Sequence, residues 1–165
     1  MPCAFFKPAA MMIHSMLSSN HIHGYSNGDP YVYCGDFNIT PGSSMYKLLT
    51  SGNGEGYDET PLPIIRPNDS NNNNINDNDN DNNWKCVTSP LSSAYKLHSN
   101  EPNFTNYAQV RDDEPFIDCL DYIFVSGEWS VNNVLSIKHR NEVQGPLPSR
   151  DEPSDHVMIA ADLEL

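Results

Sequence analysis

The sequence is poor in basic residues and contains no long apolar run. Lys and Arg total 9 against 22 Asp and Glu, which gives a formal net charge of -13 at pH 7. Because affinity for a polyanion depends on Lys and Arg along the contact, this balance excludes a nucleic-acid binder that works through a basic patch alone. The same charge balance permits a protein that binds a polyanion through bound metal cations. No stretch reaches the roughly 18 to 20 apolar residues of a membrane span, so no membrane contact is expected.

Paired cysteines and phosphate-binding loops are also missing. The four cysteines are widely spaced and include no Cys-x-x-Cys pair. This spacing argues against a disulfide framework and favours reduced thiols in an intracellular protein. The glycine-rich run at 52–56 is not followed by Gly-Lys-Ser/Thr, so it is not a P-loop.

The length of 165 residues fits one domain, interrupted by a low-complexity run. The stretch 68–83 is almost entirely Asn and Asp and predicts a disordered insertion in a surface loop. No periodic element is expected between 53 and about 90. Helices are predicted over 8–20 and from Ser43 or Ser44 to Gly52, with a polar turn over 20–30. Short strands are predicted over 31–34, 104–107, 120–125, 131–137 and 157–163. This combination of predicted helices and short strands predicts an α/β (α+β) fold.

A first polar cluster, Asp36 and Asn38, follows the predicted strand at 31–34. In extended geometry the two side chains would point the same way. The carboxylate can hold a water or accept its proton, and the carboxamide can donate to a phosphate oxygen. The alternative is an ordinary turn, because Gly-Asp and Asn-x-Thr-Pro are common turn sequences.

A second candidate is Asp121, which lies inside the apolar run Leu-Asp-Tyr-Ile-Phe-Val at 120–125. A buried carboxylate is costly unless it is paired, so the position predicts a partner such as His, Arg or a metal ion. The alternative is an edge-strand Asp that faces solvent.

A third cluster, Asp155 and His156, precedes the last predicted strand. Neighbouring residues of a strand face opposite ways, so one of them is expected to bind a metal ion while the other takes part in acid–base chemistry. The alternative is a polar turn before an edge strand.

Together the three clusters predict a site for metal-assisted hydrolysis of a phosphodiester. His156 is oriented by Asp121, Asp36 positions a water and Asn38 holds a phosphate oxygen. Asp155 faces a hard cation such as Mg²⁺, which prefers oxygen ligands.

The same segments, in this order, resemble the endonuclease/exonuclease/phosphatase superfamily. They are Cys-Gly-Asp-Phe-Asn at 34–38, Leu-Asp-Tyr-Ile at 120–123 and Ser-Asp-His at 154–156. Pro-Gly-Ser-Ser-Met-Tyr at 41–46 and Phe-Thr-Asn-Tyr at 104–107 bring the resemblance closest to nocturnin-like deadenylases and the 2′,5′-phosphodiesterase 12 type. It implies a partial DNase I-like four-layer α/β sandwich, in which residues 1–165 are the C-terminal part of the domain.

The resemblance also assigns roles to single residues. Asp36 is similar to the residue that activates the attacking water, and Asn38 to its phosphate-orienting partner. Asp121 and His156 are similar to the family's carboxylate–histidine pair. Asp155 is similar to the acidic residue of the metal site.

A substrate contact is implied for Asn106, which lies where such enzymes approach the nucleotide. The implied activity is that of a metal-dependent phosphodiesterase or exoribonuclease acting on 2′,5′-oligoadenylate or poly(A) RNA. The implied cofactor is Mg²⁺ or another divalent metal. The family's principal Glu ligand and an early Asn are absent from this chain, so the chain is expected to be an incomplete fragment that is inactive alone.

Two alternatives stay open. The chain is a truncated inactive product or binding remnant, or it is a phosphatase or DNA endonuclease of the same superfamily. The resemblance permits a mitochondrial or a cytoplasmic location and does not choose between them. The oligomeric state cannot be read from the sequence.

Overall fold

The computed structural model describes residues 8–54, 84–85 and 89–165. The helices are α1 (Pro8–Ser26), α2 (Ser44–Ser51), α3 (Ala94–His98) and the 3₁₀ turn η1 (Arg140–Glu142). The strands are β1 (Val32–Asp36), β2 (Asn53–Gly54), β3 (Trp84–Lys85), β4 (Ser92–Ser93), β5 (Asn106–Ala108), β6 (Phe116–Asp118), β7 (Asp121–Val125), β8 (Ser130–Val134) and β9 (Ala161–Glu164). No helix in these ranges is long and apolar enough to cross a bilayer.

The largest sheet has three strands in the order β1-β7-β4, and both pairings are antiparallel. The register sets Val32 opposite Val125 at one end and Asp36 opposite Asp121 at the other. Three two-stranded ribbons, β2-β3, β5-β6 and β8-β9, complete the strand pairings. This mixture of helices and antiparallel sheets confirms the predicted α/β fold class.

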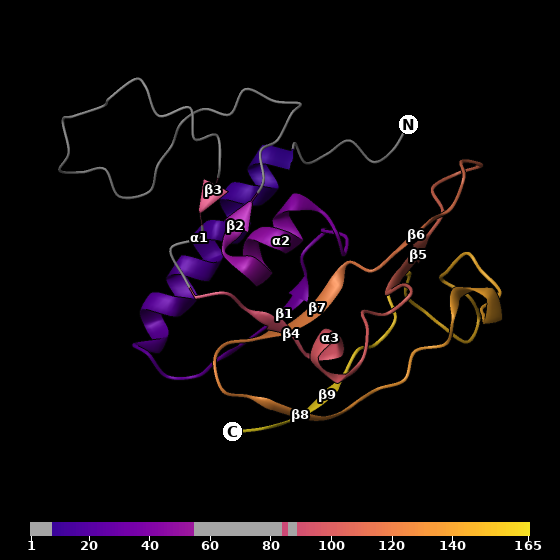
Figure 1. Cartoon of the computed structure of the whole chain (residues 1–165). Helices are drawn as coiled ribbons and strands as arrows, with labels where there is room; N and C mark the ends of the chain where they lie inside the picture. Colours follow the sequence, from indigo (N-terminus) through magenta and orange to yellow (C-terminus); the bar gives the residue numbers. More distant parts are fainter. Residues whose placement is uncertain (1–7, 55–83, 86–88) are drawn as a thin grey trace.

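The helices lie on both sides of the three-stranded sheet. Figure 1 shows α1 and α2 on one side, and α3 with β8 and β9 on the other. The side chains of Tyr122 and Phe124 alternate with their neighbours along β7 and stack on each other, with 5.0 Å between ring centroids. They form a hydrophobic core with residues of α1, of α2 and of the segments between the elements: Met16, Ile39, Met45, Leu48, Leu49, Leu91 and Cys119.

Helix α2 follows the sequence prediction closely. The Ser43 hydroxyl accepts a hydrogen bond from the Tyr46 N–H, as an N-cap does. Gly52 ends the helix with a φ of 75°, a left-handed conformation that glycine adopts without a side-chain clash.

The first helix is longer than predicted, and several strands are shorter. Residues 20–26 continue α1 although they were predicted as a polar turn, and the chain leaves the helix only at Asn27 and Gly28, where φ becomes positive. The strands predicted over 131–137 and 157–163 are reduced to β8 and β9. Their cross-strand register is interrupted between Val131 and Asn133. The predicted insertion at 68–83 lies outside the described residues.

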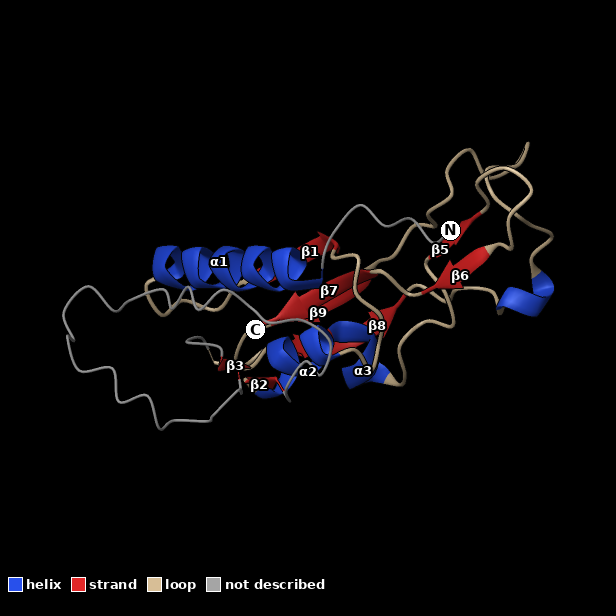
Figure 2. Ribbon diagram, turned by 90° about the horizontal axis from the view of Figure 1, so that it is seen from above, coloured by secondary structure: helices blue, strands red, loops and turns tan. Residues whose placement is uncertain are grey.

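The β5-β6 ribbon lies beyond the end of the sheet at which β7 begins, as Figure 2 shows. Two single bridges tie it to the C-terminal segment. Asn106 pairs antiparallel with His156, and Ala108 pairs parallel with Leu147. These bridges place the Ser-Asp-His segment beside the end of the central sheet.

Candidate active site

The ends of β1 and β7 bring two of the predicted carboxylates together. Asp36 and Asp121 are opposite each other in the antiparallel register. The Phe37 N–H donates to the Leu120 carbonyl over 2.9 Å, so the pairing extends one step past the strands. Both carboxylates therefore lie at the same end of the three-stranded sheet, where β1 ends and β7 begins.

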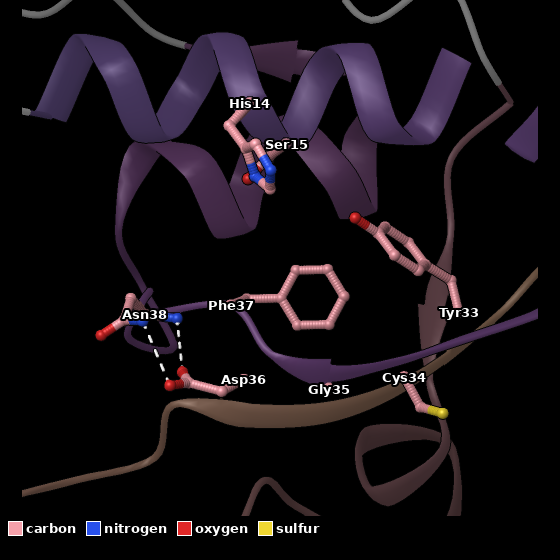
Figure 3. Close-up of a pocket in the computed structure, with 8 residues that line it drawn as sticks. All are labelled: His14, Ser15, Tyr33, Cys34, Gly35, Asp36, Phe37 and Asn38. Atoms are coloured by element: carbon pink, nitrogen blue, oxygen red, sulfur yellow. Dashed lines mark hydrogen bonds between the residues drawn. The ribbon is translucent and has the colours of Figure 1, made fainter. Parts of the chain in front are cut away.

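Asn38 leaves the extended conformation that the sequence suggested. Its φ is 52°, in the left-handed region that Asn tolerates better than most residues. The backbone N–H of Asn38 donates to Asp36 Oδ1 over 2.8 Å, and its amide Nδ2 donates to Asp36 Oδ2 over 3.1 Å. The two side chains thus face each other in a tight turn, as Figure 3 shows. The segment therefore forms the turn that the sequence offered as an alternative. The two hydrogen bonds from Asn38 hold the Asp36 carboxylate in one orientation.

The segment that carries His156 is held by main-chain hydrogen bonds to the strand around β5. The Tyr107 N–H donates to the Asp155 carbonyl, and the Val157 N–H donates to the Thr105 carbonyl, each over 2.8 Å. His156 lies between these two bonds and is thereby set at the end of the sheet where β1 ends and β7 begins.

His156 binds one carboxylate at that end of the sheet and faces the other. Its Nδ1 lies 2.8 Å from Asp121 Oδ2, and its Nε2 lies 4.0 Å from Asp36 Oδ2. A carboxylate only accepts hydrogen bonds, so Nδ1 carries the proton in this pair. The partner that the sequence predicted for Asp121 is therefore present, and the solvent-facing alternative is wrong. The ring's Nε2 is left free to exchange a proton at the Asp36 side.

The surroundings of His156 favour its charged form. Burial lowers the pKa of the imidazole, but the hydrogen bond that it donates to Asp121 and the negative charges of Asp121, Asp36 and Asp155 outweigh this effect and raise the pKa above 6.5. Three carboxylates around one imidazole make this region strongly acidic. A phosphodiester anion needs a compensating cation to approach it.

Asp155 and Asn106 lie beside the pair and face each other. The Asn106 side chain is buried, with the residue only 4% exposed. Its Nδ2 lies 3.5 Å from Asp155 Oδ2, at the limit of a hydrogen bond. Asn106 therefore faces Asp155 more than the surface, and its role as a substrate contact stays a prediction.

The sequence argument did not single out Thr105, whose hydroxyl donates to Asp121 Oδ2 over 2.7 Å. The residue lies in the Phe-Thr-Asn-Tyr segment that was noted, but the only signal for its role is a hydroxyl next to Asn106. Its partner lies 16 residues further along the chain, beyond any local sequence pattern.

A cavity of about 290 Å³ opens beside Asp36 and Asn38, between β1 and α1. Figure 3 shows Phe37 in its middle, with Tyr33 and the α1 residue His14 at the opposite side from the carboxylate. The sequence did not predict that His14, Tyr33 or Phe37 would line a cavity here. The site thus has an aromatic wall next to its polar edge.

The donor set of a divalent cation is incomplete among the residues that the structure describes. These residues contain no group of three or more His, Cys, Asp and Glu side chains placed to hold a metal ion. Asp36 and Asp155 supply hard oxygen donors of the kind that Mg²⁺ prefers, but Asp36 already accepts two bonds from Asn38. The described residues alone do not fit a complete metal site.

The family model for the Endonuclease/Exonuclease/phosphatase family matches residues 16–156. The chain belongs to this family. The match spans every candidate residue described above, from Asp36 to His156, and the family's DNase I-like α/β fold agrees with the mixed helices and antiparallel sheets seen here.

Curated relatives of this family member are similar over most of its length. The chain is 34% identical to 2′,5′-phosphodiesterase 12 of Mus musculus over 143 residues, which cover 83% of the chain and 20% of that protein. It is 31% identical to carbon catabolite repressor protein 4 homolog 4 of Arabidopsis thaliana, covering 79% of the chain and 26% of that protein. It is 33% identical to the CCR4-Not complex 3′-5′-exoribonuclease subunit Ccr4 of Aspergillus oryzae, covering 84% of the chain and 17% of that protein. The chain spans about a fifth of the length of these relatives.

Proposed function

We propose that this family member takes part in metal-dependent hydrolysis of the phosphodiester bonds of RNA, with 2′,5′-oligoadenylate or poly(A) as substrate. The observation that carries the proposal is the imidazole of His156, held by Asp121 at Nδ1 and facing Asp36 at Nε2. The names of its relatives, a 2′,5′-phosphodiesterase and a 3′-5′-exoribonuclease, support a nuclease over a phosphatase.

His156 is the proposed proton carrier. An imidazole whose Nδ1–H is bound to a carboxylate keeps its ring orientation and has a more basic Nε2, which suits general acid–base catalysis. The 4.0 Å between Nε2 and Asp36 Oδ2 is longer than a direct hydrogen bond. It allows one oxygen, of a water or of a phosphoryl group, to contact both groups.

Asp36 and Asn38 are the proposed holders of the two reacting oxygens. The Asp36 carboxylate positions the attacking water. The Asn38 amide has two N–H donors, of which one is directed to Asp36. The second is free to donate to a phosphate oxygen, and Asn106 is a further proposed contact on the substrate side.

Nucleases of this family generally use divalent metal ions. We propose that Mg²⁺ serves this chain and that Asp155 is one of its ligands. When bound, the ion would neutralise the acidic edge formed by the three carboxylates. The described residues bring together no group of three or more possible ligands, so this proposal needs further ligands besides Asp155.

A second proposal is that this chain alone binds oligoadenylate without cleaving it. The incomplete donor set favours this alternative. It agrees with the interpretation of residues 1–165 as the C-terminal part of the family domain, which we keep as a proposal.

Both proposals are tested by incubating the chain with 2′,5′-linked triadenylate and, separately, with poly(A), in Mg²⁺ and in EDTA. Hydrolysis in Mg²⁺ that is lost in EDTA and in the His156→Ala variant supports the enzyme. Binding without hydrolysis, measured by calorimetry and weakened by Asn38→Ala, supports the binding alternative. If the chain neither cleaves nor binds either substrate, both proposals are wrong.

A further inference from the structure

The Thr105 hydroxyl makes every hydrogen bond that it can. The residue is fully buried, at 0% exposure. The oxygen accepts from the backbone N–H groups of Leu120 and Asp121, over 2.8 and 3.0 Å. Because a hydroxyl has one proton and two lone pairs, its proton is left for Asp121 Oδ2, which lies 2.7 Å away. The direction of the hydroxyl is thereby fixed by three partners.

The oxygen that receives the Thr105 proton is the same one that His156 contacts. Asp121 Oδ2 accepts from the Thr105 hydroxyl on one side and from His156 Nδ1, over 2.8 Å, on the other. A carboxylate on a freely rotating side chain could offer either oxygen in many directions. With Thr105 bound, Oδ2 is held in the position that meets the imidazole.

Thr105 also fixes the other member of the pair through its backbone. Its carbonyl accepts from the Val157 N–H over 2.8 Å, directly after His156. Its own N–H donates to the Asp118 carbonyl over 3.0 Å, at the end of β6. One residue therefore contacts the chain next to His156 and the chain next to Asp121.

We infer that Thr105 is a positioning residue, which holds Asp121 Oδ2 against His156 Nδ1 so that Nε2 faces Asp36. The catalytic consequence rests on the proposed function, whereas the contact itself does not. A purely structural hydroxyl, one that only satisfies the two N–H groups at the start of β7, would stabilise the fold without ordering the imidazole.

The two roles are separated by Thr105→Val and Thr105→Ser. Valine keeps the shape of threonine and removes the hydroxyl, while serine keeps the hydroxyl and removes the methyl group. Thr50→Val is the matched control, because the Thr50 hydroxyl donates only to the Tyr46 carbonyl within α2. His156→Gln identifies the resonances of the imidazole.

The first measurement is ¹⁵N NMR of the histidine-labelled chain without metal. We expect a slowly exchanging His156 Nδ1–H in the wild type, in Thr105→Ser and in Thr50→Val. In Thr105→Val we expect its exchange to be at least 10-fold faster or the signal to be lost. An unchanged signal and exchange rate in a folded Thr105→Val would overturn the inference.

Folding of Thr105→Val is checked by circular dichroism, since the variant leaves two buried N–H groups without an acceptor. If it does not fold, Thr105→Cys takes its place, because a thiol is a weaker donor and acceptor of similar size. We then expect Nδ1–H exchange between 3- and 10-fold faster than in the wild type. Exchange at the wild-type rate in Thr105→Cys would equally overturn the inference.

The second measurement is the rate of 2′,5′-triadenylate hydrolysis. We expect kcat to fall at least 10-fold in Thr105→Val with KM within 2-fold, and both constants to stay within 3-fold of wild type in Thr105→Ser. Absence of hydrolysis in every variant, the wild type included, would contradict the proposed function and leave the NMR result to decide the role of Thr105. A Thr105→Val enzyme with wild-type kcat would contradict the inference alone.

Discussion

Strand β7 joins two regions that are built in opposite ways. Its interior residues Tyr122 and Phe124 are 1% and 0% exposed and pack in the aromatic core with α1 and α2. Its first residue, Asp121, belongs to the polar edge, which we define as Asp36, Asp121 and His156. The core is held mainly by apolar contacts, whereas each member of the polar edge has a specific polar partner.

The difference teaches where stability and chemistry lie in this chain. Apolar burial contributes roughly 25 cal/mol per Å² and has no direction, so the aromatic core stabilises the sheet on which the site is built. The three charged side chains of the polar edge are partly exposed, at 37% for Asp36, 31% for His156 and 15% for Asp121, and ion pairs that water reaches contribute little to stability. Changes in the core should therefore lower stability, and changes in the polar edge should lower activity.

The largest expected effect is that of His156→Ala on hydrolysis. General acid–base groups contribute about 10²- to 10⁴-fold to rate, so the rate of 2′,5′-triadenylate cleavage should fall by that factor. The free energy of unfolding, measured with urea, should change by less than about 1 kcal/mol. His98→Ala, on the exposed side of α3, should leave both values unchanged. A large loss of stability in His156→Ala would contradict the claim that the polar edge serves activity and the core serves stability.

Phe124→Ala should have the opposite profile. Removing a buried Phe side chain costs about 3 to 5 kcal/mol, because the transfer free energy is lost and a cavity remains. Urea unfolding should show this loss, and Leu97→Ala, at a position 52% exposed, should change stability by about 0.5 kcal/mol or less. If Phe124→Ala loses no more stability than Leu97→Ala, the aromatic residues do not form the core that we describe.

Tyr46→Phe tests a polar contact at the margin of the core. The Tyr46 hydroxyl donates to Glu101, whose other oxygen accepts from Ser93 over 3.0 Å. Burial, followed by the hydrogen bond and the charge of Glu101, raises the pKa of Tyr46. Loss of this charged hydrogen bond should cost about 1.5 to 3 kcal/mol. Tyr25→Phe, at an 87% exposed position, is the control, and equal stabilities of the two variants would show that the contact contributes nothing.

The smallest expected effect is a pH dependence of stability from His156. Its folded-state pKa is raised above 6.5, so the folded state binds the proton more tightly than the unfolded chain. The stabilisation is complete below pH 6.5 and is lost as the pH rises through the raised value. The difference in unfolding free energy between wild type and His156→Ala should therefore shrink between pH 6 and pH 9. A difference that grows over this interval would mean that burial outweighs the carboxylates.

The sequence predicts the core better than the polar edge. The Ser43 cap, the Gly52 end of α2 and the β-branched and aromatic run of β7 are local signals, and the structure confirms all three. The pairing of Asp121 with His156 could be predicted, because an isolated carboxylate in an apolar strand needs a partner. The turn at Asn38 was the alternative that its local sequence offered, and the bonds that form it join residues two positions apart. The contact of the Thr105 hydroxyl with Asp121 could not be predicted, because it depends on how distant segments meet.

The misplaced boundaries have the same cause. Nothing between residues 20 and 26 forbids a helix, and α1 continues until Asn27 and Gly28 adopt positive φ values. The ends of β8 and β9 are set by their pairing with each other and not by their own residues. Local patterns fix which elements form, and tertiary contacts fix where they stop.

A double-mutant cycle on the rate of 2′,5′-triadenylate hydrolysis tests most directly whether the polar edge acts as one site. The variants are Asp121→Asn, His156→Ala and the two together, in Mg²⁺. Residues that act as a unit give strongly non-additive losses, so we expect the double variant to be no slower than His156→Ala alone. Losses that multiply, or a wild-type chain no faster than the double variant, would contradict a shared catalytic role for these residues.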